Sequence, residues 1–134
     1  MATTTIDLSL VIPLYNEEEV FGELLSRLTD FVSALQASAA GLARNVEVIF
    51  VDDGSRDATP ALIQQACATH SWCRGVIFSR NFGHQTAVTA GMQHTRGRAV
   101  AILDGDLQDP PEVVTEFLGK MRDGYDVVYA IRTK

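Results

Sequence analysis

Two aspartates, Asp104 and Asp106, are the residues best placed to do chemistry. They follow a short apolar run within the segment 99–114, AVAILDGDLQDPPEVV. Because such a run between turn residues is typical of a buried strand, we expect both carboxylates at a strand's carboxyl end, where open α/β sheets bind ligands. Gly105 lets the backbone turn between them, so that both acids can face one point. Oxygen ligands of this kind suit Mg2+ or Mn2+, although an isolated Asp-Gly-Asp is equally consistent with an acidic turn that binds nothing.

The elements that must position these acids alternate along the 134 residues. Apolar runs predict strands at 8–14, 46–51, 75–79, 98–103 and 125–131. Apolar residues at helical spacing predict a long helix from Glu17 that ends within 36–45, a second helix that begins at Thr59-Pro60, and further helices at 86–93 and 110–121. This alternation indicates an α/β fold, a mostly parallel, Rossmann-like sheet flanked by helices on both faces. We expect a single domain over residues 1–134.

In this architecture the carboxyl ends of the strands share one edge of the sheet, which gathers side chains from four loops. These are Pro13, Tyr15, Asn16, Glu17, Asp52, Asp53, Arg80, Asn81, Asp104, Asp106 and Gln108. Because crowded carboxylates repel one another unless a cation or a hydrogen-bond donor intervenes, we expect a ligand that supplies both. A nucleotide with a metal-bound diphosphate fits, since base and ribose donors can reach Glu17 and Asp53. Tyr15 would either stack on the base or pack within the protein, and Arg80 would pair either with the diphosphate or with a neighbouring acid.

Charge and missing motifs narrow the classes of function. The net charge of −6 disfavours nucleic acid as the main partner, whereas a nucleotide is compatible with it because a metal ion offsets the charge. The sequence has no G-x-x-x-x-G-K-[ST] loop, no G-x-G-x-x-G after its first strand and no Ser/Cys–His–Asp order. It also shows no secretion-signal pattern and no apolar run of about 20 residues that would span a membrane. His84 is equally consistent with a ligand contact and with a solvated loop histidine.

Four motifs in one order, LVIPLYNEEE, VDDGSRDAT, SRNFGHQTAVTAGM and ILDGDLQDPPE, give the chain a resemblance that covers nearly its whole length. It resembles glycosyltransferase family 2, and within it the branch that moves a hexose from a nucleotide diphosphate-sugar to a polyprenyl phosphate. The resemblance implies a GT-A fold, a UDP- or GDP-sugar donor and Mg2+ or Mn2+. Asp104 and Asp106 match the D-x-D motif and become the expected catalytic pair, and Gln108 falls where this branch places a further residue beside the metal.

The candidate sites follow from the loop positions and this resemblance together. The expected metal ligands are Asp104, Asp106 and Gln108. The expected nucleotide-binding residues are Pro13, Leu14, Tyr15, Asn16, Glu17, Asp52, Asp53, Arg80, Asn81, Gly83, Asp104, Gly105 and Asp106.

The resemblance also implies a reaction and a place in the cell. An inverting displacement at the anomeric carbon, with the metal stabilising the departing diphosphate, would transfer the hexosyl group, and an anionic phosphate acceptor would need little help from a general base. Family domains continue beyond residue 134 with an acceptor-side segment, and membrane helices often follow in this branch. We therefore expect residues 1–134 to be a nucleotide-sugar-binding domain that ends before the acceptor half, inactive or slow alone. The full-length protein would lie in the cytoplasm at the inner face of a membrane.

Three other interpretations remain open from the sequence. A phosphoryl-accepting, receiver-like switch module would suit the length and the late Lys134, but receivers carry their acidic pair after the first strand. A sugar-nucleotide cytidylyl- or uridylyltransferase would open with a glycine-rich loop and a basic residue, which the first strand lacks. An inactive remnant that binds a nucleotide is the third.

Overall fold

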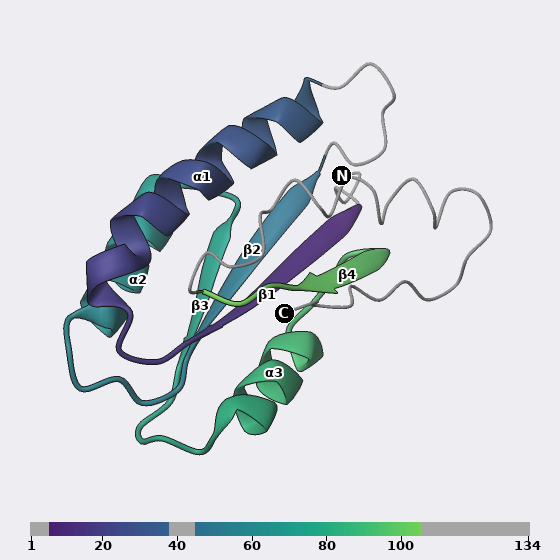
Figure 1. Cartoon of the computed structure of the whole chain (residues 1–134). Helices are drawn as coiled ribbons and strands as arrows, with labels where there is room; N and C mark the ends of the chain where they lie inside the picture. Colours follow the sequence, from purple (N-terminus) through teal and green to yellow (C-terminus); the bar gives the residue numbers. More distant parts are fainter. Residues whose placement is uncertain (1–5, 38–44, 106–134) are drawn as a thin grey trace, which may run out of the picture.

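Four strands form one parallel sheet in the computed structural model, which describes residues 6–37 and 45–105 (Figure 1). The strands are β1 (Leu8–Leu14), β2 (Val46–Asp52), β3 (Cys73–Ile77) and β4 (Ala99–Ile102), in the spatial order β3-β2-β1-β4. This is the Rossmann-type order in which the chain direction across the sheet reverses at β1, whereas receiver modules have the order 2-1-3-4-5. The sheet therefore contradicts the receiver-like alternative.

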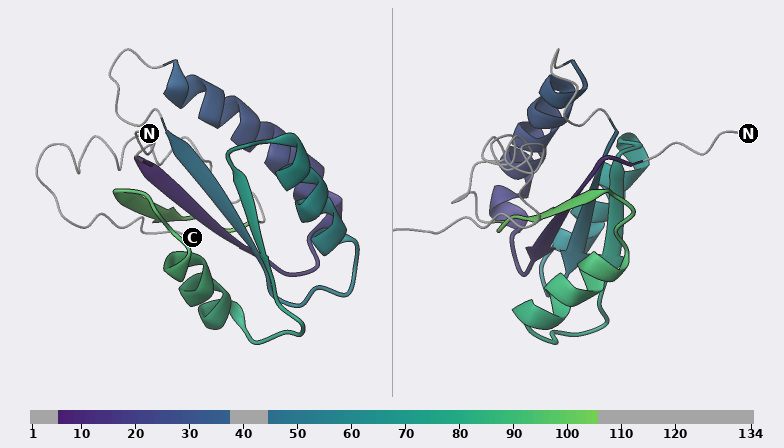
Figure 2. Two further views of the ribbon diagram at one scale, coloured as in Figure 1. Left: turned by 180° about the vertical axis from the view of Figure 1, so that it is seen from behind. Right: turned by 90° about the vertical axis from the view of Figure 1, so that its right-hand side faces the viewer.

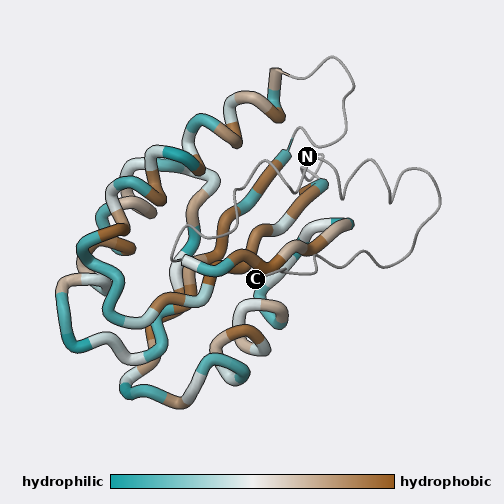
Figure 3. Tube along the Cα trace, in the orientation of Figure 1, coloured by the Kyte–Doolittle hydropathy of each residue, from teal (hydrophilic) through white to brown (hydrophobic). Residues whose placement is uncertain are grey.

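Helices cover both faces of the sheet (Figure 2). Helices α1 (Glu18–Gln36) and α2 (Thr59–Thr69) pack on one face, because both follow crossovers in one direction from β1 to β3. Helix α3 (His84–Gln93) returns the chain across β1 to β4 and packs on the other face, where Ala87 contacts the cluster of Val11, Ile49 and Val51. Every residue of β1 and β2 is buried, as expected for strands covered on both sides, and the tube coloured by hydropathy shows these central strands as its most apolar part (Figure 3).

The predicted α/β class is confirmed, and most predicted elements lie within two residues of the observed ones. The third strand begins at Cys73 rather than at the predicted residue 75, because Cys73 pairs with Val48 of β2. It ends at Ile77, although the N–H of Phe78 still donates to the carbonyl oxygen of Asp52 at 2.9 Å. Helix α3 begins at residue 84 rather than 86, directly after Gly83 (φ 105°). The predicted helix 110–121 and strand 125–131 lie outside the described residues. Among the described helices, none is long and apolar enough to cross a membrane.

A buried carboxylate ties the strands together at their amino ends, opposite the predicted site. Glu47 of β2 accepts hydrogen bonds from Ser9 Oγ at 2.6 Å, Arg74 Nη1 at 3.0 Å and the backbone N–H of Arg96 at 2.7 Å. The hydroxyl of Ser9 also accepts from the N–H of Gly97 at 2.9 Å. These bonds join β1, β2 and β3 to the loop that leads into β4, and they help to fix where β4 begins.

Candidate functional site

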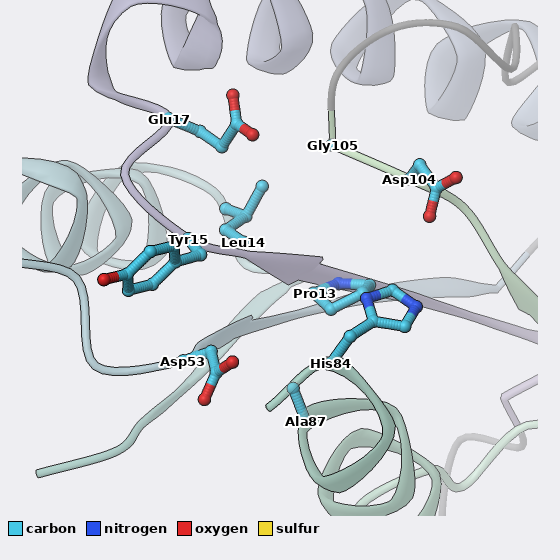
Figure 4. Close-up of a pocket in the computed structure, with 9 residues that line it drawn as sticks. All are labelled: Pro13, Leu14, Tyr15, Glu17, Asp53, His84, Ala87, Asp104 and Gly105. Carbon is cyan, nitrogen blue, oxygen red and sulfur yellow. The ribbon is translucent and has the colours of Figure 1, made fainter. Parts of the chain in front are cut away.

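A cavity of about 390 Å³ lies at the carboxyl edge of the sheet, where the strand order reverses. Such an edge is the usual ligand site of an open α/β sheet. Loops after β1, β2 and β4 and the first turn of α3 supply its walls, and Figure 4 shows their side chains around it. The lining residues are Pro13, Leu14, Tyr15, Glu17, Asp53, His84, Ala87, Asp104 and Gly105.

The β1 wall of the cavity combines an aromatic ring with a carboxylate. Pro13 lies beyond the part of β1 that pairs with β4, Leu8–Val11, so that its missing N–H costs no bond in that ladder. Tyr15 is 43 % exposed and lines the cavity rather than packing in the core, which leaves its ring available to a flat ligand. Glu17 follows two residues later and lies on the same side of the cavity, opposite Asp104 (Figure 4).

Asp53 connects the cavity to the loop after β3. Its buried carboxylate accepts hydrogen bonds from Asn81 Nδ2 at 3.1 Å and from the backbone N–H groups of Phe82 at 2.8 Å and Gly83 at 3.2 Å. The next residue, Gly54 (φ 71°), lies against the same loop, because a Cβ atom there would come within 2.1 Å of the backbone of Arg80. Asp53 therefore fixes the path of the 81–83 loop up to the start of α3, in addition to facing the cavity.

The opposite wall carries Asp104, with His84 on the same side of the cavity (Figure 4). Gly105 lies so close to β1 that a Cβ atom there would come within 2.1 Å of Leu14 Cδ2, so only glycine lets this loop approach β1. The cavity thus collects three carboxylates, Glu17, Asp53 and Asp104. Hard oxygen donors beside an aromatic ring suit a sugar or base together with a divalent cation.

The structure separates the predicted residues into two groups. Lining the cavity are Pro13, Leu14, Tyr15, Glu17, Asp53, Asp104 and Gly105. The other predicted residues within the described part do not line the cavity. These are Asn16, Asp52, Arg80, Asn81 and Gly83. Asp106 and Gln108 lie outside the described residues, and within the described part no group of three His, Cys, Asp or Glu side chains could hold a metal ion.

Each side chain of the second group has another partner. Asp52 is fully buried, and its Oδ2 accepts from the N–H of Ser55 at 3.0 Å, while Oδ1 has no hydrogen-bond partner among the described residues. The guanidinium of Arg80 lies 3.9 Å from the ring centre of Phe82, a cation–π contact, and forms no ion pair with an acid among the described residues.

Two lining residues were not among the predicted site residues. The sequence left His84 open between a ligand contact and a solvated position, and the structure places it at the cavity. Ala87 gave no chemical signal, since a small apolar residue on a helix is ordinary. It lines the cavity because α3 packs against β1 and β2 just below it.

Residues 9–134 match the domain described as Glycosyl transferase family 2. The chain belongs to this family. An undecaprenyl-phosphate 4-deoxy-4-formamido-L-arabinose transferase of Shewanella sediminis (strain HAW-EB3) is 41 % identical over 125 residues, which are 92 % of this chain and 36 % of that protein. The chain spans less than two fifths of the length of the curated relatives that it matches. Membership of family 2 confirms the resemblance seen in the four motifs.

Solved structures of glycosyltransferases share the fold. Staphylococcus aureus TarS 1–349 in complex with UDP-GlcNAc has a TM-score of 0.66 and 22 % identity, over 88 % of this chain and 32 % of that one. The mannosyltransferase PcManGT of Pyrobaculum calidifontis, in complex with GDP-Man and Mn2+, has a TM-score of 0.59 and 24 % identity, over 78 % and 28 %. At this identity the likeness shows the fold alone, which is the predicted GT-A type.

Proposed function

We propose that the cavity binds the nucleotide diphosphate of a sugar donor, UDP- or GDP-linked, and that the protein transfers the hexosyl group with inversion. The observation that carries this proposal is the convergence of Tyr15, Glu17, Asp53 and Asp104 from three strand ends on one cavity of about 390 Å³. Membership of family 2 supports the reaction class, and the TarS and PcManGT complexes carry donors of these two kinds.

Each wall of the cavity has a distinct role in this proposal. Tyr15 stacks on the base, and Glu17 and Asp53 accept hydrogen bonds from base or ribose groups. Asp104 faces the diphosphate and would hold Mg2+ or Mn2+ together with Asp106 and Gln108. The all-oxygen donor set fits a hard cation, and the PcManGT complex contains Mn2+. When bound, the ion would supply charge neutralisation to the departing diphosphate.

The acceptor in this proposal is a polyprenyl phosphate. The Shewanella relative is named as a transferase acting on undecaprenyl phosphate. A phosphate oxygen is already anionic at neutral pH, so its attack at the anomeric carbon requires no strong base from the protein. Residues 1–134 then form the nucleotide-sugar-binding domain of a protein that acts on the cytoplasmic face of a membrane, where such an acceptor lies.

The test is a calorimetric titration of the chain with UDP, GDP, CDP and TDP, with and without Mn2+. We expect one of UDP or GDP to bind, and Mn2+ to tighten its binding. Asp104→Asn should weaken the Mn2+-dependent affinity about 10- to 100-fold, the loss expected for one charge-assisted contact. Asp30→Asn makes the same change on the exposed side of α1, far from the cavity, and should leave the affinity unchanged.

Two results would contradict the proposal. One is that none of the four nucleotides binds the wild-type chain, and the other is that Asp104→Asn and Asp30→Asn bind the preferred nucleotide equally well. Calorimetric titration of the chain with UDP-glucose, UDP-GlcNAc and GDP-mannose then identifies the preferred sugar.

A further inference from the structure

Asn16 is the one described residue other than glycine whose φ is positive, at 52°. It lies between the last residue of β1, Leu14, and the first residue of α1, Glu18. Left-handed backbone is unfavourable for most side chains, and Asn is among the residues that adopt it most readily. The position therefore needs a residue of special conformation, and its neighbours in the chain, Tyr15 and Glu17, both line the cavity.

The side chain of Asn16 binds the backbone of another loop and does not line the cavity. Its Oδ1 accepts a hydrogen bond from the N–H of Arg56 at 2.9 Å. Its own N–H donates to Ser55 Oγ at 2.8 Å. Both partners belong to the loop between β2 and α2, about 40 residues away in the chain. Asn16 thus joins two loops rather than reaching into the cavity.

The residues after Asn16 are bound to the same loop and to the first residue of α2. The N–H of Glu17 donates to Thr59 Oγ1 at 3.0 Å, and the N–H of Glu18 donates to Asp57 Oδ2 at 3.2 Å. Glu18 Oε2 in turn accepts from the N–H of Ala58 at 2.9 Å. Residues 16–18 and 55–59 are therefore joined by hydrogen bonds donated from both sides. We call this set of bonds the loop clasp.

The loop clasp explains why Glu17 stays at the cavity. An extended chain would carry residue 17 about 10 Å beyond Leu14 along the strand direction. The left-handed turn at Asn16 instead brings the chain straight into α1, and the clasp holds the N–H of Glu17 against Thr59. As a result Tyr15 and Glu17 lie on the same side of the cavity, across from Asp104 (Figure 4).

We propose that Asn16 is a positioning residue for the sugar-nucleotide donor: it contacts no ligand, but sets the places of Tyr15 and Glu17 through its left-handed backbone and its bond to Arg56. This inference rests on the proposed function and revises the predicted role of Asn16 as a nucleotide contact. It predicts that two separate properties of the residue matter, tolerance of positive φ and an acceptor oxygen. Asp keeps both, Gly keeps only the first, and Ala keeps neither.

The experiment compares Asn16→Asp, Asn16→Gly and Asn16→Ala with the wild-type chain. We expect the dissociation constant of UDP or GDP with Mn2+ to rise about tenfold for Asn16→Ala and about threefold for Asn16→Gly, and to stay within about twofold for Asn16→Asp. Hydrogen exchange without nucleotide should show lost protection at the amides of Arg56, Glu17 and Glu18 in Asn16→Ala. In Asn16→Asp these amides should remain protected.

Ser9→Ala is the matched control at the other end of β1. It removes the hydroxyl that bonds to Glu47 and Gly97, and so lowers stability without touching the loop clasp. We expect its nucleotide affinity to stay within about twofold of the wild-type value. A loss of affinity in Asn16→Ala is then attributable to the loop and not to lower stability in general.

Three outcomes overturn the inference, and they are distinguishable. Wild-type affinity in Asn16→Ala, with protection at Arg56 and Glu17 lost, shows that loop order does not matter for binding. Weakened affinity with protection intact shows that Asn16 touches the nucleotide directly. If the wild-type chain itself binds no nucleotide, the proposed function fails, and the positioning role fails with it.

Discussion

At Asp53 the two carboxylate oxygens accept hydrogen bonds from Asn81, Phe82 and Gly83, and one side of the same carboxylate faces the cavity. Asp53→Asn would replace one acceptor oxygen with an NH2 group opposite these donors. Because an unsatisfied buried donor is costly, we expect the free energy of unfolding to fall by about 1–3 kcal/mol, and the affinity for the nucleotide to fall with it. Urea denaturation and calorimetry measure the two effects.

Asp30→Asn is again the control for that substitution, because it makes the same chemical change at an exposed position. Unchanged stability of Asp53→Asn would show that the 81–83 loop is held by other contacts.

How well the sequence predicted single residues depended on the distance along the chain to their partners. The position of Asp53 and Asp104 at the cavity could be predicted, because a local pattern of an apolar run ending in acids places them at a strand's carboxyl end. Asn16 and Asn81 could not be assigned their observed roles, since their partners, Arg56 and Asp53, lie 40 and 28 residues away. An amide looks the same in the sequence whether it faces a ligand or a backbone group.

Among the elements, α3 packs closely on β1 and β2, and it carries His84 and Ala87 to the cavity. A Cβ atom at Gly91 would lie 2.4 Å from Val11 Cγ1 and 3.0 Å from Val51 Cγ2. Gly91→Ala should therefore push α3 away from β1 and β2 and destabilise the fold by about 1–3 kcal/mol. Thermal unfolding measures this cost.

The matched substitution is Gly22→Ala in α1, where a Cβ atom would meet nothing within 4 Å. Alanine is the better helix former, so Gly22→Ala should stabilise the protein by about 0.5–1 kcal/mol. The two variants make the same change within a helix and differ only in what lies beside the new methyl group. If Gly91→Ala were also stabilising, the close packing of α3 would be wrong.

The element boundaries were predictable where a local signal exists. Buried runs of apolar residues identified β1 and β2 almost to the residue. In contrast, the start of β3 depends on the pairing of Cys73 with Val48, 25 residues earlier, and the run GVIFS could not reveal it. For the same reason the predicted strand runs two residues beyond Ile77, where β3 ends.

Across the whole molecule, the two edges of the sheet carry carboxylates in different surroundings. The carboxylates that line the cavity, those of Glu17, Asp53 and Asp104, gather at the carboxyl edge. At the amino edge one buried carboxylate, Glu47, is neutralised by Arg74 and Arg96. Because the strands run parallel, the bonds of Glu47 hold the register at the amino edge and leave the carboxyl edge open, where the cavity lies.

Glu47 therefore gives the fold a defined dependence on pH. Burial raises the pKa of Glu47, but hydrogen bonds from Ser9, the backbone of Arg96 and the Arg74 guanidinium outweigh burial and hold this pKa below its ordinary value. A carboxyl whose pKa is lower in the folded than in the unfolded state stabilises the fold above the unfolded value, about 4.3. That contribution is lost as the pH falls from there through the folded pKa.

Glu47→Gln should accordingly lower the free energy of unfolding by about 2–4 kcal/mol at pH 7. The difference from the wild-type chain should be constant between about pH 6 and 8 and should shrink only as the pH drops below about 4. Glu23→Gln, the same change at an exposed position of α1, should alter stability by less than about 0.5 kcal/mol. Urea denaturation at a series of pH values measures both variants. A difference for Glu47→Gln that persisted unchanged at low pH would mean that the ionised carboxylate does not join the strands, and that the shape of the side chain alone does so.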